Sequence, residues 1–216
     1  MKGRGYMSQK NEGHSYQYRA LLHQLTSKDV REKYDSIPPN SCLDKMYAWE
    51  RADAERLIWY EFNENKVAVL ADLVLRLKGY DGAAAVKKML SESPVPSDRS
   101  ACLSRLLFEW TKEEKYLDLL ITNVKQSKYR LEFVSELKCA PVCIKVYEVL
   151  KDIYLTSEDS VVRGTAVTGI LHYRGFVKDP SDLTETFSNI ASYRKFASDD
   201  AKERKKIIDL FEKGQL

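Results

Sequence analysis

Two glutamates, Glu50 and Glu61, are the residues whose type and position could most directly do chemistry. Both fall in the middle of the apolar face of a helix that the periodicity predicts over residues 42–61. Eleven residues of helix rise about 16 Å, which is too far for two carboxyl groups to flank one bond as general acid and base. A buried carboxylate is costly unless it has a partner. Each is therefore expected to face an arginine of a neighbouring helix, to lie at the rim of the core, or to be presented to a binding partner.

The motifs of the common enzyme classes do not occur in the sequence. It has no glycine-rich phosphate loop, no Gly-x-Gly-x-x-Gly, no His-Glu-x-x-His and no Gly-x-Ser-x-Gly. The three histidines lie far apart, and the four cysteines are too scattered for a disulfide framework or a zinc site. The sequence therefore predicts a non-catalytic protein with no metal and no cofactor.

The predicted helix 42–61 also concentrates acidic and aromatic side chains. Residues 37–64 hold six acids and three bases, whereas residues 1–36 hold seven bases and four acids. Tryptophan is enriched in the residues that dominate protein interfaces. We therefore expect this helix to contact a partner, and the residues predicted to do so are Asp44, Trp49, Glu50, Asp53, Trp59 and Glu61.

A second informative segment runs from Asp159 to Leu171. Relative to Asp159, valine stands at +3, arginine at +4, alanine at +7 and isoleucine at +11. This spacing resembles the second helix of a HEAT-type repeat, a helical hairpin that stacks into a curved solenoid. The resemblance implies a structural ion-pair role for Asp159 and Arg163, in which the arginine reaches an aspartate of the neighbouring repeat. The small side chains between residues 164 and 169 would let another helix or a partner approach closely.

The elements that must position these residues all read as helices. No alternating strand pattern occurs, and helical periodicity predicts an all-α fold: short hairpin repeats stacked as a HEAT-like solenoid, with an irregular helical bundle as the alternative. A polar leader, expected to be disordered, precedes a single helical domain over 16–216. The expected helices are 16–34, 42–61, 66–78, 83–90, 97–110, 111–125, 129–137, 141–155, 159–173, 180–196 and 199–213.

Composition sets limits on the function. An apolar fraction of 44% and a charged fraction of 31% are typical of a soluble globular protein, and a net charge of +3 is too small to indicate nucleic-acid binding by itself. No apolar run reaches the roughly 20 residues that a membrane helix needs, and residues 1–19 lack the apolar core of a secretory signal. A cytoplasmic protein without a membrane partner is expected.

Three functions remain open. The favoured one is a protein-binding helical module, with a bacterial immunity protein that neutralises a basic toxin domain as one candidate and a general adaptor as another. The second is a HEAT-like nucleic-acid-binding protein, and the third is an enzyme without a known motif. The bases Lys202, Arg204, Lys205 and Lys206 are neutralised by the nearby acids Asp199, Asp200 and Glu203 and are expected to form a solvated helix face. Nucleic-acid binding would depend on Lys87, Lys88, Arg99, Arg105 and Trp110.

Overall fold

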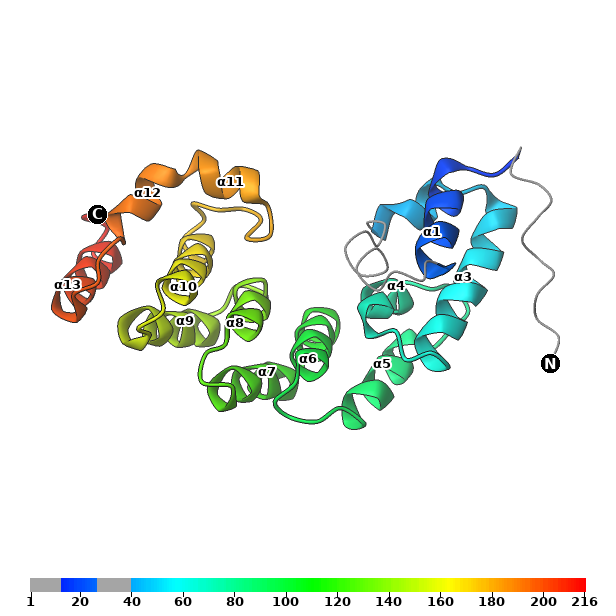
Figure 1. Cartoon of the computed structure of the whole chain (residues 1–216), viewed down its shortest axis with the longest axis horizontal. Coiled ribbons are helices and arrows are strands. Elements are labelled where there is room, and N and C mark those ends of the chain that lie inside the picture. Colours follow the sequence, from blue (N-terminus) through cyan, green and yellow to red (C-terminus); the bar gives the residue numbers. More distant parts are fainter. Residues whose placement is uncertain (1–12, 27–39) are drawn as a thin grey trace. The chain divides into compact units, whose positions relative to one another are not determined.

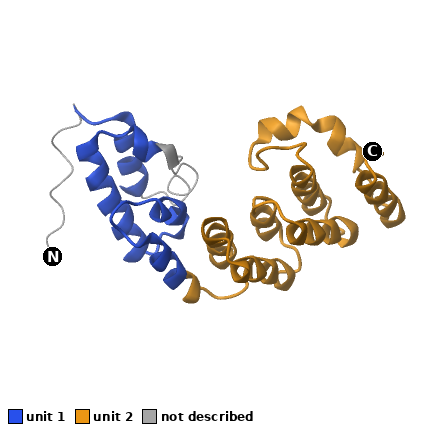
Figure 2. Cartoon of the chain, turned by 180° about the vertical axis from the view of Figure 1, so that it is seen from behind, with its two compact units in different colours: residues 1–89 blue, residues 90–216 orange. Residues whose placement is uncertain are grey.

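The structure is a computed structural model of the chain, and it describes residues 13–26 and 40–216 (Figure 1). Every regular element in these ranges is a helix, so the predicted all-α class is confirmed. The chain divides into two compact units, residues 1–89 and 90–216 (Figure 2). The prediction of a single domain over 16–216 stays a prediction. Most of the expected leader, residues 1–12, lies outside the described residues.

The first unit is organised around one long helix. Helix α3 (Ala48–Asn63) packs against α1 (Tyr16–Thr26), against the 3-10 turn η1 (Asn40–Lys45) and against α4 (Ala71–Leu75), which directly follows the turn η2 (Ala68–Leu70). Helix α5 (Gly82–Ser91) ends the unit and passes its boundary by two residues. The side chains that fill this core, each no more than 2% exposed, include Leu21, Leu43, Ala54, Ile58, Phe62 and Leu70.

The second unit is a succession of helices in neighbouring pairs: α6 (Asp98–Thr111), α7 (Glu114–Gln126), α8 (Leu131–Lys138), α9 (Ile144–Thr156), α10 (Ser160–Tyr173), α11 (Leu183–Ser188), α12 (Ile190–Lys195) and α13 (Ala201–Glu212). Helix α8 packs against both α6 and α10, and α9 packs against α10 and α13. Aspartates start several helices by accepting from free backbone N–H groups, as Asp159 does for α10 and Asp200 for α13. This packing is compatible with a helical repeat and with an irregular bundle.

Several element boundaries differ from the prediction. The helix expected over 42–61 begins only at Ala48, because residues 40–45 form η1 with Cys42 and Leu43 buried. The helix expected over 66–78 is reduced to η2 and α4. The helix expected over 180–196 is divided at Asn189, whose ψ of 17° departs from α geometry. The second half of the helix expected over 16–34 lies outside the described residues.

None of the described helices combines the length and the apolar character needed to cross a membrane. This agrees with the absence of a long apolar run in the sequence.

Candidate functional site

The start of α3 and the segment before α1 carry a connected group of rings with one acid, which we call the Trp49 surface: His14, Tyr47, Trp49 and Asp53. Trp49 is 59% exposed and Tyr47 is 56% exposed, and their nearly parallel rings have centroids 6.3 Å apart. The ring of His14 lies 4.9 Å from that of Trp49. Large rings that are held against one another yet open to solvent are typical of binding surfaces.

The carboxylate of Glu50 connects the two segments that carry this surface. It is fully buried, and it accepts from the backbone N–H of Ser15 (2.6 Å), from the Ser15 hydroxyl (2.6 Å) and from the backbone N–H of Tyr47 (3.0 Å). Its Oε1 also lies 3.1 Å from Nδ1 of His14. The bond to Tyr47 fixes the start of α3, and the bonds to Ser15 attach the segment before α1 to that start.

Burial by itself would raise the pKa of Glu50, because it penalises the charged form. The hydrogen bonds from Ser15, Tyr47 and His14 outweigh burial and hold the pKa below its usual value. Glu50 is therefore a buried anion that organises the surface. It does not itself face a partner, which corrects the prediction that it would bind one.

Asp53 lies one turn further along α3 and is linked to the same group of rings. It accepts from the hydroxyl of Tyr18 and pairs with Arg56, and the ring of Tyr18 stacks on His14 with centroids 4.8 Å apart. The hydrogen bond from Tyr18 has the largest effect and lowers the pKa of Asp53. Partial burial opposes it, and the hydrogen bond and positive charge of Arg56 lower the pKa further. Asp53 thus stays ionised beside the exposed rings.

Asp44 lies in η1, before α3, and pairs with an arginine of α3. Its carboxylate is 76% exposed and lies 2.7 Å from Nη1 of Arg51, whose Nε is 2.8 Å from the buried Glu55. Arg51 and Arg56 are thus shared among three acids, whereas the donors described for Glu50 are backbone N–H groups, a hydroxyl and an imidazole. Four acids around the start of α3 (Asp44, Glu50, Asp53 and Glu55) are therefore accompanied by two arginines, which leaves an excess of negative charge among these six residues.

The two remaining predicted residues lie at the other end of α3. Trp59 is half-buried and its ring lies 4.7 Å from that of Tyr80, while Glu61 accepts from Nδ2 of Asn65 at 2.9 Å. Ten residues of helix separate Trp59 from Trp49, a rise of about 15 Å. The structure therefore connects Trp49 and Asp53 through His14 and Tyr18. It joins Asp44 to Arg51 instead, and it leaves Trp59 and Glu61 outside the Trp49 surface.

Arg163 has a structural position in the second unit. It is 7% exposed, donates to the carbonyl oxygens of Ser157 (3.2 Å) and Glu158 (2.7 Å), and pairs with Asp199, which lies just before α13. Asp159 instead caps α10 by accepting from the N–H groups of residues 161 and 162. Arg163 thus reaches an aspartate 36 residues away. That the two segments are repeats of one unit stays a prediction.

Arg204 is a residue whose role the sequence reading missed. The sequence predicts that Arg204 belongs to a solvated basic face. In the structure it is 6% exposed and donates to the carbonyl oxygens of Leu155 and Asp199, both at 2.9 Å. The signal was present, because the spacing of Asp200 and Arg204 repeats that of Asp159 and Arg163. The three neighbouring lysines are exposed, as expected. Because they surround Arg204 in the sequence, the segment looks uniformly basic and the repeated spacing is hard to recognise.

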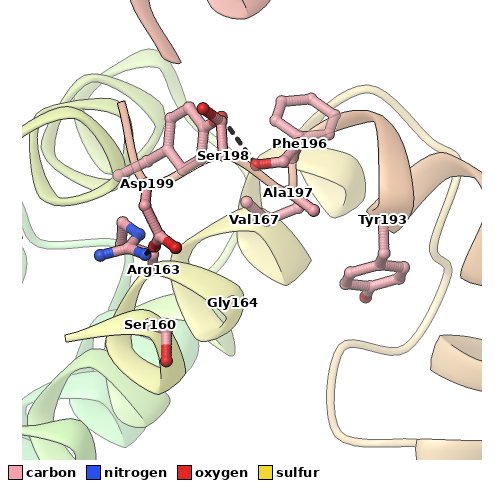
Figure 3. A pocket seen from close by; sticks show the side chains of 10 residues that line it. Ser160, Arg163, Gly164, Val167, Tyr193, Phe196, Ala197, Ser198 and Asp199 are labelled. Carbon is pink, nitrogen blue, oxygen red and sulfur yellow. Dashed lines mark hydrogen bonds and ion pairs between the residues drawn. The ribbon is translucent and has the colours of Figure 1, made fainter. Parts of the chain in front are cut away.

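A pocket of about 470 Å³ lies between α10 and the segment 193–199 (Figure 3). Three of its polar side chains are engaged within the fold, since Arg163 pairs with Asp199 and the hydroxyl of Tyr154 donates to the carbonyl oxygen of Phe196. The hydroxyl of Tyr193 is buried without a hydrogen-bond partner among the described residues. Its lining contains no histidine or cysteine that could serve as a base or thiol nucleophile. The lining residues are Tyr154, Ser160, Arg163, Gly164, Val167, Tyr193, Phe196, Ala197, Ser198 and Asp199.

The residues proposed for nucleic-acid binding are divided between the two units. Lys87 and Lys88 belong to the first unit, and the other three belong to the second. Nε of Arg105 lies 2.6 Å from Glu136 and its Nη1 lies 3.3 Å from Glu109, so two carboxylates neutralise this guanidinium. Within residues 13–26 and 40–216, no cluster of three metal-ligating side chains occurs.

Comparison of the chain with family models, with curated proteins and with solved structures found no match.

Proposed function

We propose that this chain is a non-catalytic protein-binding module and that the Trp49 surface is the face that binds the partner. The observation that carries the proposal is the pair of exposed, stacked rings of Tyr47 and Trp49, held in place by the buried carboxylate of Glu50. Rings fixed in advance lose little conformational entropy on binding, which is why tryptophan and tyrosine dominate binding free energies.

The charges around the rings indicate the chemistry of the partner. Asp53 is connected to the rings through Tyr18, and Glu50 adds a buried negative charge beside His14. A lysine or arginine side chain placed over Trp49 would be attracted by the ring through a cation–π interaction and by the nearby negative charges. We therefore propose a basic protein partner. A basic toxin domain that the chain neutralises is the particular partner that would make it an immunity protein, and a non-toxic basic partner would make it an adaptor.

The experiment uses the tagged full chain to recover a stoichiometric partner from the cells that produce it, followed by calorimetric titration with the purified partner. Trp49→Ala is expected to weaken binding at least tenfold, which corresponds to about 1.4 kcal/mol. Trp110→Ala is the matched control, because Trp110 is 47% exposed but lies on α6 of the second unit, and it should change the affinity less than twofold.

The outcomes separate the proposed functions. If the two tryptophan variants bind equally well, the Trp49 surface is not the binding face. If the eluate holds nucleic acid that salt releases, with no stoichiometric protein, the nucleic-acid alternative replaces this proposal. The recovered partner can also be produced alone to test whether it is toxic. If the wild-type chain relieves that toxicity and Trp49→Ala does not, the chain is an inhibitor of the partner.

A further inference from the structure

The pocket between α10 and the segment 193–199 has a wall of aromatic rings that the fold itself fixes (Figure 3). Tyr154 and Phe196 pack edge to face with ring centroids 5.6 Å apart, and the hydroxyl of Tyr154 donates to the carbonyl oxygen of Phe196 at 2.9 Å. The ring of Phe196 also packs on that of Phe211, with centroids 5.1 Å apart. The volume of about 470 Å³ lies in the range of small-molecule sites, which are usually formed before the ligand binds. The pocket thus has the size and the fixed wall of a ligand site.

Helix α10 leaves room for a ligand at Gly164. This residue lines the pocket, and a Cβ at its position would meet nothing within 4 Å. At Gly169 of the same helix a Cβ would lie 2.5 Å from Cδ1 of Leu150, so close packing accounts for that glycine. Packing does not account for Gly164, although glycine lowers the stability of a helix relative to alanine. A larger side chain at Gly164 would extend into the space that the pocket provides.

Tyr193 of α12 supplies the pocket with a hydrogen-bond donor. Its hydroxyl oxygen is buried, and it has no hydrogen-bond partner in the described part of the chain. Burying a hydroxyl in this way is unfavourable, and most buried polar groups are therefore hydrogen-bonded. The residue as a whole is half-buried and no residue of α12 is fully buried, so little packing opposes a small rotation of its side chain. A ligand that carries an acceptor would provide the partner for this hydroxyl.

The two charged side chains of the lining, Arg163 and Asp199, neutralise each other. They form an ion pair, and Arg163 donates in addition to the carbonyl oxygens of residues 157 and 158. A charged ligand would therefore gain little net attraction in the pocket. The rest of the lining is mainly aromatic or small, and aromatic rings attract other rings in offset-stacked or edge-to-face arrangements. These properties favour an uncharged, planar aromatic ligand.

We propose that this pocket binds an uncharged, planar heteroaromatic molecule, which packs against Tyr193 and Phe196 and accepts a hydrogen bond from the hydroxyl of Tyr193. The site lies within the second unit and does not depend on the function proposed for the Trp49 surface. The hydroxyl of Tyr193 makes the site selective, because it favours a ring with an acceptor over a hydrocarbon of the same shape.

The test is an NMR titration of the ¹⁵N-labelled full chain with quinoline, which is uncharged at neutral pH and has one acceptor, its ring nitrogen. Naphthalene is the matched probe, because it has the same shape and no such acceptor. For a probe with roughly ten non-hydrogen atoms we expect a dissociation constant of about 1 mM. The amide signals that shift should be those of residues 160–167 and 193–199. Tyr193→Phe should weaken quinoline binding about fivefold and leave the response to naphthalene, measured up to its solubility limit, unchanged.

A second pair of variants tests the location of the bound probe. Gly164→Leu should abolish the quinoline shifts, because the leucine side chain takes up the space of the ligand. Leucine is the better helix former, so this variant should unfold at the same temperature as the wild type or higher, and a loss of binding cannot be ascribed to unfolding. Val161→Leu is the matched control, since Val161 is 59% exposed on α10 and does not line the pocket. This control should bind quinoline as the wild type does.

The stability of Tyr193→Phe separates a ligand-binding role from a structural one. Removing this hydroxyl should leave the free energy of unfolding of the free chain unchanged or raised, because the hydroxyl is buried without a partner among the described residues. A wild type that shows no quinoline shifts would overturn the proposal. So would shifts that persist in Gly164→Leu, because quinoline would then bind elsewhere. A Tyr193→Phe variant that weakens the binding of both probes equally, or of neither, would overturn it as well.

Discussion

At the scale of single residues, Glu50 shows how one buried charge can hold exposed side chains in position although it is not itself exposed. Its carboxylate accepts from Ser15 and Tyr47 and lies beside His14, so it joins the segment before α1 to the start of α3. The exposed rings of Tyr47 and Trp49 lie on either side of this junction in the sequence. Their orientation therefore depends on a group that is itself fully buried.

This role of Glu50 predicts a specific dependence of stability on pH. A folded-state pKa below the usual value of 4.5 means that the carboxylate contributes stability above about pH 4.5, and that this contribution is lost as the pH falls through the folded pKa. Glu50→Gln leaves buried donors without an acceptor, and we expect it to lower the free energy of unfolding by about 1–3 kcal/mol at pH 7. Urea denaturation from pH 7 to pH 3 should show the two proteins converging in acid. A difference that stays constant over this range would contradict the assignment.

The sequence predicted that Glu50 is on the apolar face of its helix, but it did not predict the partners of Glu50. The helical period encodes the burial of a position, because it depends only on neighbours in the same helix. Ser15 and His14 lie 35 and 36 residues away, and no local spacing specifies such contacts. Arg204 differs, because its spacing from Asp200 was readable in the sequence and only the adjacent lysines obscured it.

At the scale of the elements, α10 shows what a helix needs for close packing. It contains two glycines in different surroundings. A Cβ on Gly169 would lie 2.5 Å from Cδ1 of Leu150 and 3.2 Å from Cβ of Lys138, whereas a Cβ on Gly164 would meet nothing within 4 Å. Gly169 thus allows α10 to approach both α9 and α8, while Gly164 faces open space.

The two glycines of α10 predict opposite effects of one substitution. Gly164→Ala should raise the free energy of unfolding by roughly 0.5–1 kcal/mol, since alanine has the higher helix propensity. Gly169→Ala should lower it by about 1–2 kcal/mol, because overpacking exceeds the same gain in propensity. Thermal or urea unfolding of the two variants measures the difference. Equal effects at both positions would mean that α10 does not pack on α8 and α9 as closely as the structure has it.

Element boundaries were predicted well where a side chain caps the helix locally. The helices at 159–173 and 199–213 match α10 and α13 within two residues, because Asp159 and Asp200 accept from the first free N–H groups. The start of α3 was misplaced, because Glu50 sets it by accepting from Tyr47 while residues 40–45 form a separate turn. The break at Asn189 had no proline or glycine to mark it.

At the scale of the whole molecule, the chain divides into two units that each enclose their own buried side chains. Helical periodicity predicted helices throughout but not this division, since the same apolar spacing occurs on both sides of residue 90. Local contacts dominate each unit, with consecutive helices packing on one another. Two cores of this kind can unfold as one cooperative body or as two.

A pair of matched core substitutions distinguishes these behaviours. Phe62 in α3 is fully buried and Phe133 in α8 is 1% exposed, so replacing either by alanine should cost about 3–5 kcal/mol within its own unit. We expect Phe62→Ala to accelerate amide hydrogen exchange in α3 and α4 while α8 to α10 keep wild-type protection, and Phe133→Ala to do the reverse. Mass spectrometry of peptic fragments resolves the two regions. Equal acceleration in both units would mean that they unfold together as the single domain predicted from the sequence, because only a cooperative body spreads the loss of one buried ring over all its helices.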